Sequence, residues 1–377
     1  MTHWLLRRPP AVEVFAVEDR TAQLVWRRAG PGPIEVRVAE RVIVVETDGG
    51  PGSLLVDDLM PDTPYELVVR GPGLAVADYI HRFRTLAPPP GELLTSIGTI
   101  SDLHLGADYF GYFATIRERP APEIGAGLRC ATAAVEAMND WGADHVVFKG
   151  DVVHHGTTEQ WEMAAQLLDN VAGSTDMMLG NHEVRSSRRV DPVEATAGLT
   201  EDFSRPVRVR DMPGVRLVVA DTATPGRHAG RVAGIHDEVV DAVSTADGPA
   251  IVMLHHNLRH APVPTFLPLG VPHRQSQRLL DTIATANPST IVTSGHTHRN
   301  RRIDRNGIPA IEVGSPRDYP GVWCGYAVYE GGVRQVLRRV DRADCLAWTE
   351  RTRWAALGAW GRWSPGRMAD RCFTHIW

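Results

Sequence analysis

The stretch Ile291-Val292-Thr293-Ser294-Gly295-His296-Thr297-His298 decides the fold, because in it a short apolar strand ends directly on two histidines. Four other apolar runs end in the same way. They are followed by the segments 101–104, 149–151, 180–183 and 255–256. Apolar residues at three- and four-residue spacing predict helices over 128–141, 159–171, 238–245 and 275–286. Strands that alternate with helices predict an α/β domain whose sheets are buried between helices.

Polar side chains of one chemical kind follow these strands. Sites in α/β folds form beyond the carboxyl ends of strands, so we expect these side chains to meet at one edge of the domain. They are aspartate, histidine and asparagine, which are the ligand types of transition metals. A single Asp-x-His or His-x-His is usually an ordinary polar loop. Five such ends in one chain instead predict a metal site.

The segments that follow these predicted strands resemble the motifs of a known family. The motifs Asp102-x-His104, Gly150-Asp151, Gly180-Asn181-His182-Glu183, His255 and Gly295-His296-x-His298 are similar to the signature of calcineurin-like metallophosphoesterases. The resemblance spans roughly residues 97–316. It implies a four-layer α/β/β/α sandwich with a dinuclear metal centre.

The resemblance also implies a role for each ligand. The first metal would be held by Asp102, His104 and His298. The second would be held by Asn181, His255 and His296, and Asp151 would bridge the two. The family pattern selects His255 over His256, a choice that spacing alone leaves open. The ligand set accepts Mn, Fe, Zn or Co in the divalent or trivalent state.

The implied chemistry is phosphoester hydrolysis. Two metals would clamp the phosphoryl oxygens and turn a bridging water, held at Asp151, into an attacking hydroxide. His182 would protonate the leaving oxygen or stabilise the transition state, since the pKa of histidine suits this at pH 7. The alternative for His182 is a residue that only orients its neighbours by hydrogen bonding.

Two branches of the family compete. An all-β domain before the phosphoesterase domain resembles the layout of purple acid phosphatases. Those enzymes have a tyrosine ligand where this chain has His154, and they lack the histidine that stands here at position 104. The bacterial cyclic-nucleotide phosphodiesterase-like branch is a better match, because its first motif reads Ser-Asp-x-His-Leu, as residues 101–105 do.

Further features are similar to that branch, and others depart from it. Arg129 opens a helix and Asp221 follows a strand, as in the branch. The departures are Glu183 in place of aspartate, His154 in place of an acidic residue and Asn257 in place of proline. They leave the substrate open. The chain is therefore predicted to hydrolyse a small phosphodiester, with cyclic nucleotides as one candidate. The alternatives are a phosphomonoesterase and a non-enzymatic scaffold, and the complete ligand set opposes the scaffold.

The N-terminal part has a different pattern. Residues 11–86 alternate apolar and polar side chains with a period of two, which predicts a small antiparallel sandwich. The segment 59–69 resembles the tyrosine corner of fibronectin type III domains, in which the hydroxyl of Tyr65 would bond to upstream backbone. Pro88-Pro89-Pro90-Gly91 predicts a stiff linker. The predicted units are a sandwich at 1–87, the linker at 88–91, the phosphoesterase domain at 92–340 and a tail at 341–377.

Composition excludes several classes of protein. The chain has 377 residues, 43% of them hydrophobic, which excludes a mostly disordered protein. Its net charge of −5 opposes nucleic acid as a partner and weakens a nuclease hypothesis. Four scattered cysteines without a C-x-x-C pair predict free thiols. Because no signal peptide or membrane-spanning run is apparent, we expect a cytoplasmic protein.

Specificity is expected on three long loops, 106–127, 184–205 and 257–273. The first carries Tyr109, Phe110, Tyr112 and Phe113, for which packing is favoured over stacking on a base. Arginines that could meet extra phosphate charge, or simply be solvated, are Arg185, Arg188, Arg189 and Arg299. The tail holds Trp348, Trp354, Trp360, Trp363 and Trp377. We expect it to fold back over the domain, with homodimerisation as the second hypothesis.

Overall fold

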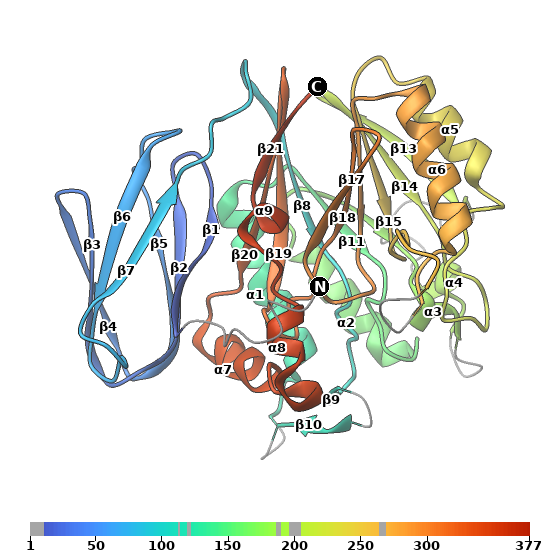
Figure 1. The fold of residues 1–377 in the computed structure, drawn as a ribbon. Coiled ribbons are helices and arrows are strands. Elements are labelled where there is room, and N and C mark those ends of the chain that lie inside the picture. Colours follow the sequence, from blue (N-terminus) through green and yellow to red (C-terminus); the bar gives the residue numbers. More distant parts are fainter. Residues whose placement is uncertain (1–10, 112–113, 119–121, 186–189, 196–204, 264–268) are drawn as a thin grey trace.

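The computed structural model describes residues 11–111, 114–118, 122–185, 190–195, 205–263 and 269–377. They form a small all-β sandwich beside a larger α/β sandwich, as predicted (Figure 1). Within these residues, no helix combines the length and the apolar character that crossing a bilayer requires. The four cysteines are buried free thiols.

The small sandwich consists of two antiparallel sheets. One has the order β1 (Val12–Val17), β2 (Ala22–Ala29) and β5 (Gly50–Val56). The other has the order β4 (Arg41–Thr47), β3 (Gly32–Val38), β6 (Pro64–Arg70) and β7 (Tyr79–Arg84). The backbone N–H of Met60 donates to the Tyr65 hydroxyl at 2.8 Å, which is the hydrogen bond that the tyrosine motif predicted. The likeness to fibronectin type III domains stays a prediction.

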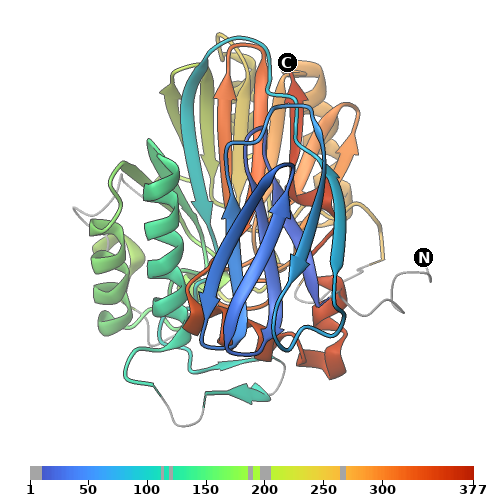
Figure 2. The ribbon, with the colours of Figure 1, turned by 90° about the vertical axis from the view of Figure 1, so that its left-hand side faces the viewer.

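The larger part is built on two six-stranded sheets that face each other (Figures 1 and 2). The first sheet has the order β12 (Ser174–Met178), β11 (His145–Lys149), β8 (Leu93–Ile100), β19 (Val322–Tyr329), β20 (Gly332–Arg339) and β21 (Phe373–Ile376). The second has the order β13 (Val207–Met212), β14 (Val215–Ala220), β15 (Ala250–Leu254), β16 (Thr290–Ser294), β18 (Ile308–Glu312) and β17 (Arg301–Arg305).

Helices cover the outer face of each sheet. The helices α1 (Ala126–Trp141) and α2 (Thr158–Asp169) pack on the first sheet, and α5 (His236–Ser244) and α6 (His273–Ala286) pack on the second. The short elements of the loops are β9 (Tyr109–Phe110), β10 (Ile116–Arg117), α3 (Asn181–Arg185) and α4 (Pro192–Ala195). The result is the predicted four-layer α/β/β/α sandwich.

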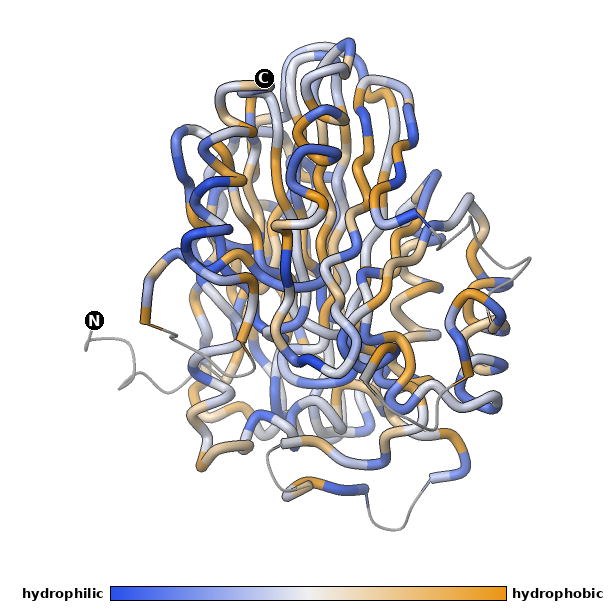
Figure 3. Tube along the Cα trace, turned by 90° about the vertical axis from the view of Figure 1, so that its right-hand side faces the viewer, coloured by the Kyte–Doolittle hydropathy of each residue, from blue (hydrophilic) through white to orange (hydrophobic). Residues whose placement is uncertain are grey.

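Strand alternation explains the layers. Along β11, Val147 points into the core between the sheets, whereas Val146 and Phe148 point to the helices α1 and α2. In the second sheet Ile251 faces the inner core and Val252 faces α5 and α6. Because both faces of each sheet are covered, these strands are apolar throughout. Figure 3 shows hydrophobic residues concentrated along the strands.

The predicted element ends agree closely with the structure. The strand ends predicted at Ile100, Ala220 and Leu254 are confirmed. Those predicted near Phe148, Leu179 and Thr293 differ by one residue. The four predicted helices are present, with starts that differ by one or two residues.

The tail folds back on the α/β sandwich, as expected. It contains α7 (Ala343–Thr352), a 3-10 turn (Ala355–Gly358), α8 (Trp360–Trp363), α9 (Met368–Arg371) and β21. Strand β21 pairs antiparallel with β20 and so adds the last strand of the first sheet. The tail is therefore part of this sandwich, and a role in homodimerisation stays a prediction.

Candidate metal centre

The seven predicted ligands lie on turns that follow five strands. Asp102 and His104 follow β8, Asp151 follows β11, Asn181 follows β12, His255 follows β15, and His296 and His298 follow β16. Three of these strands belong to the first sheet and two to the second. The structure therefore brings all seven to the carboxyl edge shared by both sheets. Six are buried, and the side chain of His298 is 16% exposed.

One group of ligand atoms comes from Asp102, His104 and His298. Their donor atoms all lie within 4.8 Å of one another. The Nε2 atoms of His104 and His298 are 3.2 Å apart, and His298 Nε2 is 3.5 Å from Asp102 Oδ1. Two imidazole nitrogens and a carboxylate oxygen that converge in this way suit a transition metal ion.

The carboxylate of Asp151 lies between two groups of histidines. Its Oδ2 atom is 3.4 Å from His255 Nε2 and 3.9 Å from His104 Nε2. One oxygen therefore faces a histidine of each predicted metal position.

A second group is formed around His255. Its donor atoms and those of His256 and His296 lie within 4.8 Å of one another. The buried Oδ1 of Asn181 and Nε2 of His255 have no hydrogen-bond partner within the described part of the chain. Buried polar atoms normally have partners, so this pair fits acceptors that face a cation. Both His255 and His256 pair through Nδ1, with the Lys149 carbonyl and with Thr222 Oγ1, and the Nε2 of each has no described hydrogen-bond partner. The contact that favours His255 is that of its Nε2 with Asp151 Oδ2 at 3.4 Å.

The backbone at these turns is unusual. Asp102, His104, Asp151, His296 and His298 all have φ between 46° and 67°. They are five of the twelve non-glycine residues with positive φ in the ranges that the structure describes. Such conformations cost about 1–3 kcal/mol each and collect at functional sites. The turns therefore aim side chains at the centre at the expense of backbone stability.

Burial and neighbouring charges shift the pKa values of the histidines in this centre. Burial alone would lower the pKa of His255, but the carboxylate of Asp151 raises it to about 10. Burial, together with the neighbouring imidazole of His182, holds the pKa of His104 well below its ordinary value. Burial and His255 lower the pKa of His296 to about 3. The Asp151 carboxylate thus favours positive charge on the side that faces His255, which is the electrostatic environment that a cation requires.

Glu183 ties two of the turns together. Its Oε2 accepts hydrogen bonds from the backbone N–H groups of Gly180 and Asp151, at 2.7 and 3.0 Å. Its Oε1 accepts a third from Val153 at 2.9 Å. Burial, followed by the charge of Asp151, raises the pKa of Glu183 to about 8. This glutamate, a departure from the branch pattern, fixes Asp151 relative to the turn that carries Asn181.

Asp318 is a functional candidate that sequence reasoning missed. It is fully buried, and His298 Nδ1 lies 2.7 Å from its Oδ2. A histidine ligand usually donates its second ring N–H to a carboxylate, which fixes the ring and the tautomer. The sequence signal was weak: Asp318 stands just after the small-residue turn at 314–316, with no metal-type neighbour.

His182 lies beside the first group. Its backbone N–H donates to Asp151 Oδ1 at 2.8 Å, and its Nδ1 donates to the carbonyl of His154 at 2.9 Å. The ring stands edge-on to that of His104, with centroids 4.4 Å apart. His154 itself is buried and contacts the hydroxyl of Tyr109 at 3.1 Å. Position 154, the tyrosine position of purple acid phosphatases, is thus part of a histidine cluster.

The arginines and aromatic residues that the sequence analysis named as candidates for substrate recognition are not members of the two ligand groups. Arg299 is buried in an ion pair with Glu312, so its charge is already neutralised by a carboxylate. Arg129 pairs with Glu118 and with Asp344 of the tail. Tyr112, Phe113, Arg188, Arg189 and the side chain of Arg185 lie outside the described residues.

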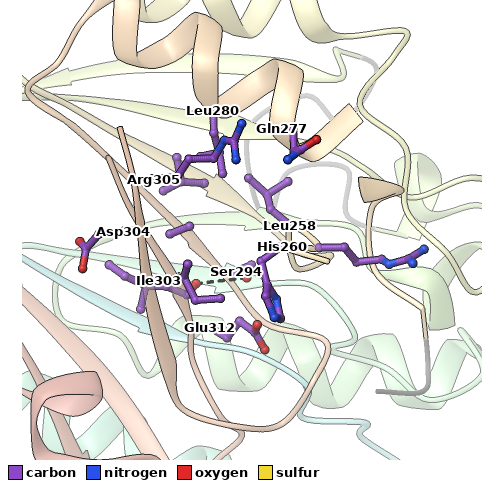
Figure 4. A pocket seen from close by; sticks show the side chains of 13 residues that line it. Leu258, His260, Gln277, Leu280, Ser294, Ile303, Asp304, Arg305 and Glu312 are labelled. Atoms are coloured by element: carbon purple, nitrogen blue, oxygen red, sulfur yellow. Dashed lines mark hydrogen bonds between the residues drawn. The ribbon is translucent and has the colours of Figure 1, made fainter. Parts of the chain in front are cut away.

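A cavity of about 250 Å³ lies apart from these ligands, between α6 and the strands β17 and β18 (Figure 4). Leu258, Leu280 and Ile303 contribute apolar surface, and none of the seven predicted ligands lines it. Glu312 at its edge also accepts a hydrogen bond from Thr297 Oγ1 at 2.8 Å. The cavity and the group of metal-type side chains are therefore separate places in the second sheet's surroundings.

Comparison with known proteins agrees with the geometry. Residues 96–330 match the model of the calcineurin-like phosphoesterase superfamily domain. A probable cyclic nucleotide phosphodiesterase of Rhodococcus erythropolis is 29% identical over 62% of this chain and 73% of its own length. A cAMP/cGMP dual specificity phosphodiesterase of Mycobacterium tuberculosis is 27% identical over 64% of this chain and 72% of its own. The crystal structure of a dimetal phosphatase from Danio rerio has a TM-score of 0.48 at 14% identity, over 66% of this chain and 97% of that one.

Proposed function

Since this chain belongs to the calcineurin-like phosphoesterase superfamily and is a metal-dependent phosphoester hydrolase, we propose that it cleaves phosphodiesters at a dinuclear centre, with cyclic nucleotides as its substrates. The observation that carries the proposal is the position of Asp151. A single carboxylate oxygen faces His104 on one side and His255 on the other. A carboxylate in that position would suit a ligand shared by two cations.

The residues divide into two half-sites. Asp102, His104 and His298 would hold one metal, and Asn181, His255 and His296 the other. Bound metals would supply an activated water and neutralise charge on the phosphoryl oxygens. Asp151 would keep both half-sites at a fixed separation. His182, beside His104, would give a proton to the leaving oxygen.

Support for a diester substrate is of two kinds. Both relatives reported above carry phosphodiesterase names. The first motif, at residues 101–105, has the pattern of the cyclic-nucleotide branch.

Hydrolysis of bis(4-nitrophenyl) phosphate tests the metal requirement. We expect chelation to abolish the activity and Mn²⁺ to restore it. Asp151→Asn should remove activity at all Mn²⁺ concentrations, whereas Asp304→Asn, at an exposed position outside the centre, should not. Adenosine 3′,5′-cyclic phosphate and 5′-adenylate then separate diesterase from monoesterase. Activity that survives chelation would contradict the metal requirement. A wild-type protein that stays inactive in Mn²⁺ would contradict the proposal as a whole and favour the scaffold hypothesis.

A further inference from the structure

The tail is fastened to the turn that carries His296 and His298. The backbone N–H of Asn300 donates to the carbonyl of Ser364 at 2.9 Å, just after α8. Its side-chain amide donates to the carbonyl of Pro365 at 3.3 Å. The guanidinium of Arg299 lies 4.4 Å from the ring centre of Trp363. Helix α8 therefore has a fixed position relative to the metal ligands.

This position brings Trp360 to the open side of the centre. Its ring centroid is 6.4 Å from that of His298, the most exposed of the predicted ligands. Phe110 of β9 lies 6.2 Å from His298 and 5.5 Å from Trp360. The indole N–H of Trp360 donates to the carbonyl of Tyr319 at 3.1 Å, which holds the ring in place. Two segments about 250 residues apart thus build one aromatic wall, made of Phe110 and Trp360.

The wall lies at the border of the core. Phe110 packs partly on the core under α1, whereas Trp360 belongs to none of the hydrophobic clusters of the described residues. Trp360 also contacts Trp363, with ring centroids 5.4 Å apart. Its side chain is half-buried, so part of its surface remains accessible.

We propose that the wall of Trp360 and Phe110 binds a flat ring carried by the phosphodiester, so that the C-terminal tail determines substrate specificity. The inference rests on the proposed function, because it places the phosphoryl group at the metals and its organic substituent on the wall. A nucleobase fits this chemistry, since every base presents a face that stacks on an aromatic side chain. Such stacking tolerates different bases, because it uses the face of the ring and not its hydrogen-bonding edge. The tail is then part of the substrate site as well as a cover of the sheet.

Matched substrates that differ only in the ring test the inference. One pair is adenosine 3′,5′-cyclic phosphate and methyl ribofuranoside 3,5-cyclic phosphate, which lacks the base. The other pair is phenyl and ethyl 4-nitrophenyl phosphate, which share the nitrophenyl leaving group and differ in whether the second ester substituent is a ring. For each pair we take kcat/KM of the substrate that carries the extra ring and divide it by kcat/KM of the substrate that lacks it. We expect Trp360→Leu to lower this ratio about ten-fold in at least one pair. Trp360→Phe should keep most of the preference, and Trp354→Leu, at an exposed tail position, should leave it unchanged.

The outcomes separate the two proposals. An equal loss of kcat/KM on both members of each pair, or an unchanged ratio, would overturn the wall and leave the phosphodiesterase function standing. A wild-type protein that hydrolyses no diester in Mn²⁺ would overturn both. If Trp360→Leu does not fold, Phe110→Leu tests the other side of the wall with the same ratio.

Discussion

At the scale of residues, His182 and the predicted ligand His298 are held in position by hydrogen bonds to neighbouring residues. His182 is fixed at its backbone N–H by Asp151 and at Nδ1 by the carbonyl of His154. These two contacts make Nε2 the atom that can carry a second proton toward a substrate. His298 is held in the same way by Asp318. The positions of the predicted ligands are therefore set partly by residues outside the predicted ligand set.

The proton role of His182 predicts a dependence on the leaving group. His182→Ala should lower kcat by about 10²–10⁴-fold on diesters with alkoxide leaving groups, which need a proton. The loss should be much smaller on nitrophenyl esters, whose leaving group is stable as an anion. Steady-state kinetics on both classes checks this, with His155→Ala, an exposed neighbour, as the control. An equal loss on both classes would show that His182 only orients its surroundings.

The contact of Asp318 with His298 predicts an effect on metal affinity. Asp318→Asn removes the charge that orients the imidazole, so affinity should fall about 10–100-fold. Metal titration against a chelator of known affinity measures this. Asp304→Asn, an exposed carboxylate change in β17, should leave the affinity unchanged. Unaltered metal binding in Asp318→Asn would mean that the ring is held by packing.

At the scale of elements, the loops after the neighbouring strands β11 and β12 are joined by one buried carboxyl group, that of Glu183. Glu183 at the start of α3 binds three backbone N–H groups, of Asp151, Val153 and Gly180. It thereby connects the turn after β11 to the turn after β12. The left-handed turns at Asp102 and Asp151 need such restraint, because their backbone conformations are unfavourable alone.

Removing this restraint should destabilise the protein. Glu183→Ala leaves three buried N–H groups without partners, at about 1–3 kcal/mol each, so the free energy of unfolding should fall by about 3 kcal/mol or more. Urea unfolding of the metal-free protein measures this loss. Glu194→Ala, an exposed change in α4, serves as the control. A stability within about 0.5 kcal/mol of wild type would show that water replaces the carboxylate.

Local sequence pattern predicted the elements but not every neighbour. The apolar runs ending at Ile100 and Leu254 are bounded by polar residues, so their ends can be read from the chain. Partners that are distant in sequence carry no such signal. Asp318 was missed because its role depends on a turn twenty residues earlier, at His298. The place of Trp360 depends on how the tail packs, which periodicity does not encode.

At the scale of the molecule, the small sandwich is joined to the larger one by buried charges. Glu18 lies between the two parts and is 4% exposed. It accepts hydrogen bonds from Arg338 and, at 3.0 Å, from Arg334, both on β20. The inner core between the two sheets also includes Phe15 and Val25 of the small sandwich. This interface, more than the proline-rich linker, fixes the orientation of the N-terminal part.

The charge of Glu18 predicts a pH-dependent stability. Burial alone would raise its pKa, but Arg338 and Arg334 outweigh burial and hold that pKa below its ordinary value. The stabilisation that the ionised Glu18 carboxylate provides is therefore complete above the pKa of Glu18 in the unfolded chain. It is lost as the pH falls through the lower pKa of Glu18 in the folded protein. Glu18→Gln should cost about 3 kcal/mol at pH 7, because it leaves the largely buried charge of Arg338 without its carboxylate, whereas Arg334 still pairs with Asp19. Urea unfolding between pH 3 and 7 should show this difference from wild type becoming smaller as the pH falls.

The control is Glu35→Gln, in the half-exposed pair with Arg37, which should change the free energy of unfolding by less than about 1 kcal/mol. A difference for Glu18→Gln that stays constant with pH would mean that packing, and not charge, joins the two parts.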